Sequence, residues 1–254
     1  MVIISLCVPK RIPRMLSSVI PERRLARAGI KMGRWAAQVA AWFLIGWSVA
    51  DATAGSPQNV LTAAEVADGW QLLFDGKSMD DWKASDAPGT FSIRNGEIIV
   101  HGPRSYLYYL GRVQQHNFKN FELTTEVWTA HGANSGIFFH TLWQPAGGPD
   151  NGFEVQIDNS HSDPRRTAGL YDVKDVYDAV AADYQWFAMD IRVQGKHVVT
   201  SVDGKVIVDW TEPANWVPPD RHPGRRIASG TFALQGHDPG SEIHFRNIKV
   251  RALP

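Results

Sequence analysis

Hydrophobic and polar residues alternate along the segment 152–158, which reads Gly-Phe-Glu-Val-Gln-Ile-Asp. Side chains of a β-strand point alternately to opposite faces, so this segment predicts a strand that carries Glu154, Gln156 and Asp158 on one face. That face is rich in hydrogen-bond acceptors and has no cation beside it in the sequence. It is either an ordinary solvated face of an antiparallel sheet or the floor of a cleft, and the alternation leaves both interpretations open.

The same two-residue period recurs along most of the chain. It predicts strands at residues 71–74, 91–94, 97–100, 106–110, 118–128, 136–141, 152–158, 186–194, 197–202, 205–210, 226–235 and 242–251. Asn95-Gly96 and Asp203-Gly204 separate successive strands, and both dipeptides accept the positive φ angles of a two-residue hairpin. Many antiparallel strands without alternating helices predict an all-β fold, a two-sheet antiparallel jelly-roll sandwich of the concanavalin A-like type.

Segments outside these strands are of two kinds. A short helix is predicted within 58–68, because Thr62 and Glu65 have the spacing of a capping box. Residues 159–184 and the proline-rich residues 211–225 form longer irregular segments. Long loops in a compact domain tend to be functional, so we expect these two to rim one concave face of the sandwich.

The first 54 residues predict a leader that contains a secretory signal peptide. Basic residues dominate positions 1–34, an apolar run occupies 35–49, and small residues follow, with cleavage expected after Ala52 or Ala54. A membrane anchor is the alternative, but the apolar run is shorter than the roughly 20 residues of a membrane span. Met32 marks an alternative start. We therefore expect a leader at 1–54, a linker or short helix at 55–68, a jelly-roll domain at 69–254, and a periplasmic or secreted protein with no membrane anchor after cleavage.

Removing the leader changes the charge of the chain. The whole sequence has 26 basic and 26 acidic residues; eight basic and two acidic residues precede Thr53, which leaves 18 and 24 and a net charge of −6. Nucleic acids and anionic lipids require a basic surface, so we expect neither as a partner. The single cysteine, Cys7, lies in the leader, so the remaining chain has no disulfide and no thiol chemistry.

Several separate motifs occur in an order that resembles the 3-keto-disaccharide hydrolase domain family, long described as a domain of unknown function. The resemblance covers residues 69–253 and rests on Gly69-Trp-Gln-Leu-Leu-Phe-Asp-Gly-Lys-Ser-Met-Asp-Asp-Trp82, Asn134-Ser-Gly-Ile-Phe-Phe, Gly152-Phe-Glu-Val-Gln-Ile, Leu170-Tyr-Asp, Val202-Asp-Gly-Lys-Val, Leu234-Gln-Gly-His237 and Phe245-Arg-Asn-Ile248.

This resemblance implies a sugar site on the concave face and an enzyme that acts on glycosides whose C3 hydroxyl is already oxidised to a ketone. It therefore also implies a functional partner, a sugar 3-dehydrogenase that supplies the oxidised carbohydrate. The sequence departs from the family at His140, where Arg is more usual, and at Asp81, where Gly is usual. The proline-rich segment after Thr211 is also longer than in the family.

Ordinary glycoside hydrolysis uses two carboxyl groups, about 5 to 5.5 Å apart for retention or about 6.5 to 9.5 Å apart for inversion. Along one strand face, residues two apart lie about 7 Å from each other and residues four apart about 13 Å. The near neighbour of Glu154 is therefore the amide Gln156, and Asp158 is too distant. Glu126 could stand opposite Glu154 on an adjacent strand, which keeps an ordinary glucanase-like glycosidase open as an alternative.

A 3-keto-glycoside makes a smaller demand, because its ketone acidifies the proton on C2. One base can remove that proton, and the C1 substituent then leaves once the enolate charge is stabilised. We assign the base to Glu154, whose pKa neighbouring acids would raise. We assign the acid, or a ligand to the ketone, to His237. Hydrolysis and elimination both remain open, as does a non-catalytic carbohydrate-binding module on the same scaffold.

The predicted substrate-binding residues are those expected to meet sugar hydroxyls or sugar rings. They are Asn134, His140, Gln156, Asp158, Tyr171, Gln235, Glu126 and Trp143. Trp143 is the candidate stacking platform, whereas Trp82, Trp186 and Trp210 are assigned to the core, because most Trp side chains in a sandwich lie there.

No cofactor and no metal are expected, because no spacing reaches a metal motif. The alternative is a divalent cation that chelates the keto and hydroxyl oxygens. Its candidate ligands are Glu126, Glu154, Asp158 and His237.

Overall fold

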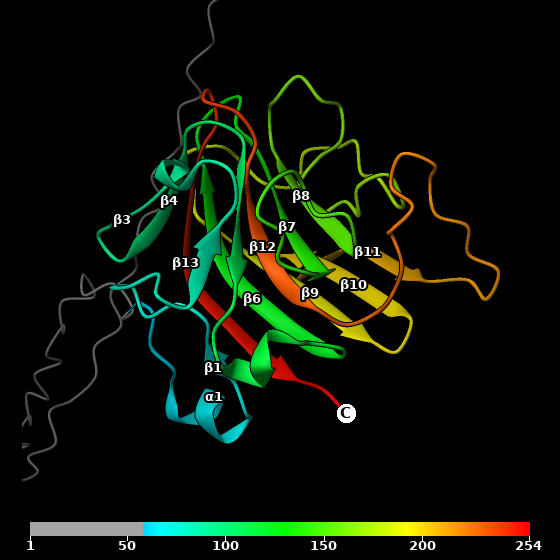
Figure 1. Cartoon of the computed structure of the whole chain (residues 1–254), viewed down its shortest axis with the longest axis horizontal. Coiled ribbons are helices and arrows are strands. Elements are labelled where there is room, and N and C mark those ends of the chain that lie inside the picture. Colours follow the sequence, from blue (N-terminus) through cyan, green and yellow to red (C-terminus); the bar gives the residue numbers. More distant parts are fainter. Residues whose placement is uncertain (1–57) are drawn as a thin grey trace, which may run out of the picture. The chain divides into compact units, whose positions relative to one another are not determined.

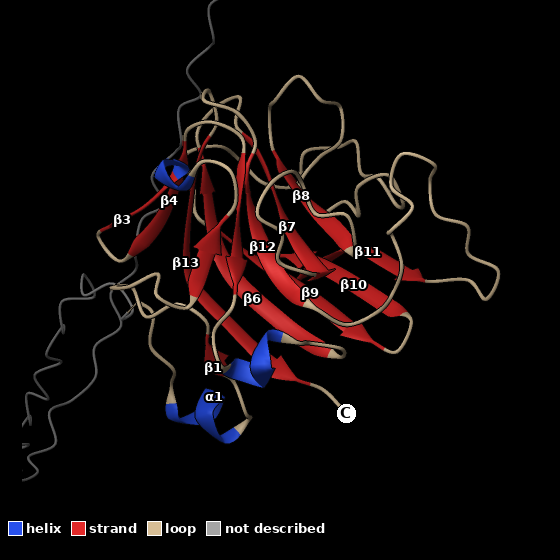
Figure 2. Cartoon of the chain, in the orientation of Figure 1, coloured by secondary structure: helices blue, strands red, loops and turns tan. Residues whose placement is uncertain are grey.

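The computed structural model describes residues 58–254. The predicted leader at 1–54 and its signal peptide lie outside the described residues. Two antiparallel sheets account for almost all the regular structure, with short helices at α1 (Ala63–Ala67), η1 (Pro88–Thr90) and η2 (Val113–His116) (Figures 1 and 2). Within residues 58–254, no helix has the length and apolar character to cross a membrane.

Eight strands form the large sheet, in the order β11-β10-β9-β6-β13-β4-β3, with β1 also paired to β13. Their bounds are β1 Gln71–Leu72, β3 Phe91–Arg94, β4 Glu97–His101, β6 Phe121–Thr129, β9 Phe187–Gln194, β10 His197–Val202, β11 Lys205–Thr211 and β13 Glu242–Ala252.

Five strands form the small sheet, in the order β2-β5-β12-β7-β8. Their bounds are β2 Trp82–Ala84, β5 Ser105–Tyr109, β12 Thr231–Gly236, β7 Asn134–Thr141 and β8 Phe153–Asp158. The predicted two-sheet antiparallel jelly roll is confirmed. The three-residue β2 was not predicted, because so short an edge strand has no readable alternation.

Local sequence signals set the tight turns and the helix start as predicted. At the β3–β4 hairpin, Asn95 and Gly96 have φ values of 55° and 79°. These positive angles match the twist of the flanking strands. Thr62 caps α1 by accepting a hydrogen bond from the Glu65 backbone, and the Glu65 carboxylate accepts one from the Thr62 backbone at 2.8 Å.

The core lies between the two sheets, where their apolar faces meet. Phe121 of β6 contacts Phe139 of β7 and Phe232 of β12 edge to face, with ring centroids 5.7 and 4.9 Å apart. Each of these rings is at most 1% exposed. Phe153, Val155 and Ile157 of β8 point into the same core, so the polar residues between them face outward from the sandwich.

At β8, the outward face of the small sheet is shielded from solvent, because both long irregular segments fold over it. Segment 159–184 is tied to β8 by hydrogen bonds from Gln156 N to Gly169 O and from Tyr171 N to Glu154 O, each 2.9 Å long. Segment 211–225 is tied to the residue before β8 by a 3.0 Å hydrogen bond from Gly152 N to Gly224 O. Figure 1 shows both loops beside β8. All six residues of β8 are therefore buried.

Of the three tryptophans predicted to lie in the core, two pack in or against the core and one lies outside it. Trp82 belongs to the core and is 7% exposed, and Trp210 packs against the core from a partly buried position. The prediction for Trp186 is wrong: it lies outside the core, with the Arg246 guanidinium 3.9 Å from its ring centroid. Phe187 and Met189 of β9 point into the core, so the alternation of side chains places residue 186 on the opposite face.

Candidate functional site

A polar cavity of about 120 Å³ opens on the covered face of the small sheet. Its lining comes from the strands β7, β8 and β12, from both covering segments, and from the loops before β5 and after β12. The residues are Arg104, Asn134, Glu154, Gln156, Asp163, Tyr171, His222, Gln235 and His237. A larger cavity of about 280 Å³ lies on the large sheet, but its Glu122 and Arg192 already pair with each other at 3.1 Å. We therefore place the functional site at the smaller cavity.

Glu154 is the central carboxylate of this cavity and is only 6% exposed. Burial raises its pKa, and the nearby Arg225, His237 and Arg104 oppose that rise. The cause is therefore burial rather than the neighbouring acids we expected. The side chain also lies over Gly136 of β7, where a Cβ atom would come within 2.6 Å of Glu154 Oε1. Glycine at 136 thus provides the space that the carboxylate occupies.

Arg225 is the partner of Glu154, and no pattern in the sequence points to it. Its Nη2 lies 3.2 Å from Glu154 Oε2, and the side chain is only 3% exposed. A parallel bridge between Gly224 and Asn151 holds the end of the proline-rich segment beside β8. The outward face of β8, which carries Glu154, Gln156 and Asp158, therefore does have cationic partners. Arg225 comes from a segment distant in the sequence, and Arg166 comes from the loop that follows β8.

Three amide side chains predicted to bind substrate, Asn134, Gln156 and Gln235, line the same cavity as the Glu154 carboxylate. Gln156 and Gln235 are at most 4% exposed, and the Oε1 atom of each has no hydrogen-bond partner among residues 58–254. Asn134 accepts a long hydrogen bond of 3.4 Å from Gln156 Nε2. Buried polar atoms without partners are costly, so these oxygens are suited to receive hydroxyl groups of a ligand.

His237 lines the cavity just beyond the end of β12, on the same side as Gln235. Its Nδ1 donates to Asp238 Oδ2 at 2.7 Å, which directs the other ring nitrogen away from that carboxylate. Asp238 also accepts from Ser241 Oγ at 2.8 Å. The intervening Gly236 packs on Thr90, where a Cβ atom would approach Thr90 Cγ2 to 2.5 Å. His237 is thus held in one orientation and can exchange a proton with a ligand.

Tyr171 forms one wall of the cavity with His222. Their ring centroids are 6.1 Å apart in an edge-on arrangement, and the Arg165 guanidinium lies 4.7 Å from the Tyr171 centroid. Burial raises the pKa of Tyr171 and lowers the pKa of His222. Both side chains are therefore neutral hydrogen-bonding groups near pH 7.

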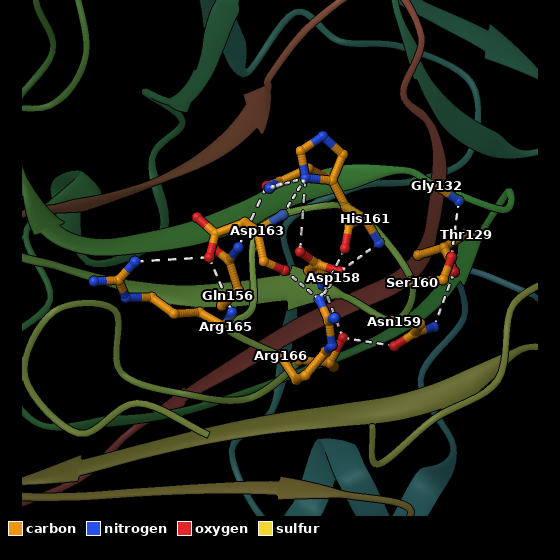
Figure 3. Close-up of polar contacts among 12 residues, drawn as sticks. Thr129, Gly132, Gln156, Asp158, Asn159, Ser160, His161, Asp163, Arg165 and Arg166 are labelled. Atoms are coloured by element: carbon orange, nitrogen blue, oxygen red, sulfur yellow. Dashed lines mark hydrogen bonds and ion pairs between the residues drawn. The ribbon is translucent and has the colours of Figure 1, made fainter. Parts of the chain in front are cut away.

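Asp158 anchors the loop after β8 through its contacts with that loop (Figure 3). It is not among the residues that line the cavity. It is fully buried, pairs with Arg166 Nη1 at 2.9 Å and accepts from the His161 backbone at 2.8 Å. We predicted a substrate-binding role for it, and its position instead supports a structural one.

Three other predicted site residues are not brought into the cavity. Glu126 lies on β6 of the large sheet and pairs with Arg246, so the expectation that it faces Glu154 from an adjacent strand is wrong. His140 is buried at the end of β7, where its Nε2 bonds to Lys119 O at 2.9 Å. Trp143 packs beside Tyr108, with Lys83 Nζ 3.8 Å from its centroid, away from the cavity lining.

The possible metal ligands converge differently from our expectation. Among residues 58–254, the group that could hold a metal ion consists of His161, His237 and Asp238. One ligand atom of each lies within 4.8 Å of the other two. Of the predicted ligands, only His237 belongs to it. Asp238 accepts three hydrogen bonds there, from His237, Gly240 and Ser241.

Sequence reasoning missed three residues that line the cavity, Arg104, Asp163 and His222. It also missed Arg225, which pairs with Glu154. His222 and Arg225 lie on either side of Pro223, at the end of segment 211–225, which was expected to rim the site. Their position in this loop was therefore a usable signal. No spacing, however, distinguishes His222 and Arg225 from the other charged residues of the loop.

Comparisons with known proteins agree with this architecture. A model of the 3-keto-alpha-glucoside-1,2-lyase-like domain matches residues 69–251. A 3-keto-disaccharide hydrolase from Bacteroides thetaiotaomicron is 26% identical, in an alignment covering 80% of this chain and 88% of that protein.

Two crystal structures of proposed glycosyl hydrolases from Parabacteroides distasonis share the fold. The first has a TM-score of 0.68 and 21% identity and covers 78% of this chain and all of the other. The second has a TM-score of 0.59 and 24% identity and covers 72% and 99%. The family match and the hydrolase relative support a glycosyl hydrolase-like function.

Proposed function

Because this chain belongs to the 3-keto-alpha-glucoside-1,2-lyase-like domain family, we propose that it cleaves 3-keto-glycosides, including 3-keto-disaccharides, with Glu154 as the base. The observation that carries the proposal is the buried carboxylate of Glu154 in a cavity of hydrogen-bonding side chains. The other carboxylate of that lining, Asp163, pairs with Arg165 at 3.6 Å. The candidate second carboxyl group, Glu126, belongs to the other sheet. An ordinary two-carboxylate glycosidase mechanism therefore loses the partner that we considered for it.

In the proposed reaction, Glu154 takes the proton from C2 and the electron pair of that bond forms an enolate with the C3 ketone. The enolate then returns its electrons to form a C1–C2 double bond, and the C1 substituent leaves with its bonding pair. His237 gives that substituent a proton. Addition of water across the double bond would complete a hydrolysis, and release of the unsaturated ketone would make the reaction an elimination.

The charged neighbours of Glu154 prepare it for this role. Arg225 favours the ionised carboxylate, which is the form that accepts a proton, although burial opposes ionisation. The unpartnered oxygens of Gln156 and Gln235 are placed to receive hydroxyl groups of the sugar. A buried base beside a fixed cation resembles the arrangement that enzymes use to bring a carboxylate pKa toward the working pH.

The test is release of 4-nitrophenol from a 4-nitrophenyl 3-keto-glucoside and from its unoxidised parent. We expect turnover of the keto substrate alone, with kcat reduced about 10²- to 10⁴-fold in Glu154→Gln and unchanged in the matched control Glu126→Gln. Parallel assays with EDTA test our expectation that no metal is required. Sugar binding without turnover of either substrate would instead favour a carbohydrate-binding module, and turnover of the parent would favour an ordinary glycosidase.

The proposal extends to the setting of the reaction. The signal-like leader motivates export to the periplasm or beyond, and the ketone requires a sugar 3-dehydrogenase acting earlier. Detection of the chain with a shortened N-terminus in the periplasmic fraction would support export, and a full-length chain in the cytoplasm would contradict it.

A further inference from the structure

Two further cavities continue the polar cavity toward the loop between β7 and β8. The nearer one has a volume of about 210 Å³ and shares Glu154 and Arg104 with the polar cavity. The farther one, of about 290 Å³, shares Tyr106 and Gly148 with the nearer one. Glu154 thus stands where the polar cavity joins this extension, and a continuous groove passes over it.

We propose that this extension is the subsite for the group released from C1, and that the group it fits is a second hexopyranose. The inference rests on the proposed function, because it places C2 of the keto sugar at Glu154. C1 is bonded to C2, so a keto ring held by the amides of the polar cavity has its C1 substituent near Glu154. The nearer cavity of the extension is lined by Glu154, so it is the space available to the C1 substituent.

The lining of the extension has two chemically different parts. Its floor consists of Tyr106 and Phe138, which pack edge to face with centroids 5.6 Å apart and are at most 4% exposed. Its rim carries the exposed charged groups of Arg104, Asp150 and Asp86. A hexopyranose has apolar C–H surfaces on its ring faces and hydroxyl groups around its edge, so it matches a floor and rim of this kind.

Gly148 controls the width of the groove where the two extension cavities meet. A Cβ atom there would lie 2.9 Å from the Tyr106 hydroxyl oxygen and 3.2 Å from Tyr106 Cζ. That hydroxyl is held by Arg104 Nε and Nη2 at 3.0 and 2.9 Å, and Gln144 Nε2 bonds to Gly148 O at 2.6 Å. Neither the Tyr106 ring nor the backbone at Gly148 can move away from the other without losing these hydrogen bonds. A larger residue at 148 would therefore obstruct the groove and leave the amides of the polar cavity in place.

The experiment compares kcat/KM for a 3-keto-disaccharide and for the methyl 3-keto-glucoside of the same anomeric configuration. In Gly148→Val, we expect the value for the disaccharide to fall at least about tenfold more than the value for the methyl glycoside, because only the disaccharide must occupy the extension. Gly148→Ala should act in the same direction with a smaller effect. The control is Gly89→Val, since a Cβ atom at Gly89 meets nothing within 4 Å.

Selectivity within one variant is independent of how much of the protein is folded, so the ratio of the two values remains informative even if Gly148→Val is less stable. Equal changes for both substrates in an active enzyme would overturn the subsite and leave the proposed function intact. A wild-type protein that turns over neither keto substrate would overturn the proposed function itself.

Discussion

The strands β6 and β8 have the same alternation of apolar and polar residues but very different outer faces. On β6, Glu122 and Glu126 are partly exposed and pair with arginines on neighbouring strands. On β8, Glu154 is covered by segment 211–225 and pairs with the buried Arg225. Alternation therefore determines which residues leave the core, and the covering loops determine whether those residues meet water. A carboxylate becomes chemically unusual only in the second case.

The sharpest way to test this difference is to remove the cation from each pair. We expect Arg225→Met to lower the free energy of unfolding by about 3 to 5 kcal/mol, because it leaves Glu154 buried without a partner. Arg246→Met removes the partner of the more exposed Glu126 and the cation–π contact with Trp186, and it should cost at most about 2 kcal/mol in total. Urea denaturation at pH 7 measures both changes. Equal losses would mean that the two faces do not differ in effective burial.

Histidines should show the same contrast between covered and exposed positions. Burial lowers the pKa of His140 from 6.5 to about 4. Its folded pKa is below its unfolded value, so the stability it contributes is present above about pH 6.5 and is lost as pH falls through about 4. The shift corresponds to a loss of about 3 kcal/mol.

Urea denaturation between pH 4 and pH 7 measures this loss, and His140→Asn should remove it. Asparagine is chosen because residue 140 has a φ of 56°, which asparagine tolerates better than most residues. The control is His131→Asn, whose side chain is 72% exposed, and it should keep the wild-type pH dependence. An unchanged dependence in His140→Asn would assign the acid sensitivity to other groups.

A third prediction moves the carboxylate without removing it. In Gly136→Ala, the new methyl group would lie 2.6 Å from Glu154 Oε1 and must displace the side chain. We expect kcat/KM for the keto substrate to fall about 100-fold, because small displacements of a catalytic group are costly. Gly89→Ala should leave kcat/KM unchanged. Full activity in Gly136→Ala would show that the observed position of Glu154 is not the reactive one.

The smallest expected effect concerns pH and stability at Glu154. Because burial raises its pKa above 4.5, the folded state retains this proton to higher pH than the unfolded state does. Wild-type stability should therefore fall relative to Glu154→Gln as pH rises above about 4.5 through the folded pKa. Urea denaturation of both proteins from pH 4 to pH 8 measures the difference. A gap that stays constant across this range would contradict the raised pKa.

The site itself was only partly predictable. Glu154, Gln156 and Gln235 were identified because two-residue spacing on a strand places side chains on one face, and β8 and β12 keep that spacing. His237 lies just beyond the end of β12 and still lines the cavity. Glu126 was misplaced because alternation does not tell which sheet a strand joins. His140 was misplaced because its positive φ angle departs from regular strand geometry at the end of β7.

The amino-acid sequence by itself determined the strands, their inward and outward faces, and the tight turns, because these depend on the period of side chains and on the φ angles of single residues. It also carried the family motifs. Only the tertiary structure decided which outward face became a cavity and which cation joined Glu154. Arg225 is 71 residues from Glu154 in the chain, and it reaches the carboxylate because Gly224 pairs with Asn151 at the start of β8. Such a contact depends on how loops close over a sheet, and no local pattern of residues encodes it.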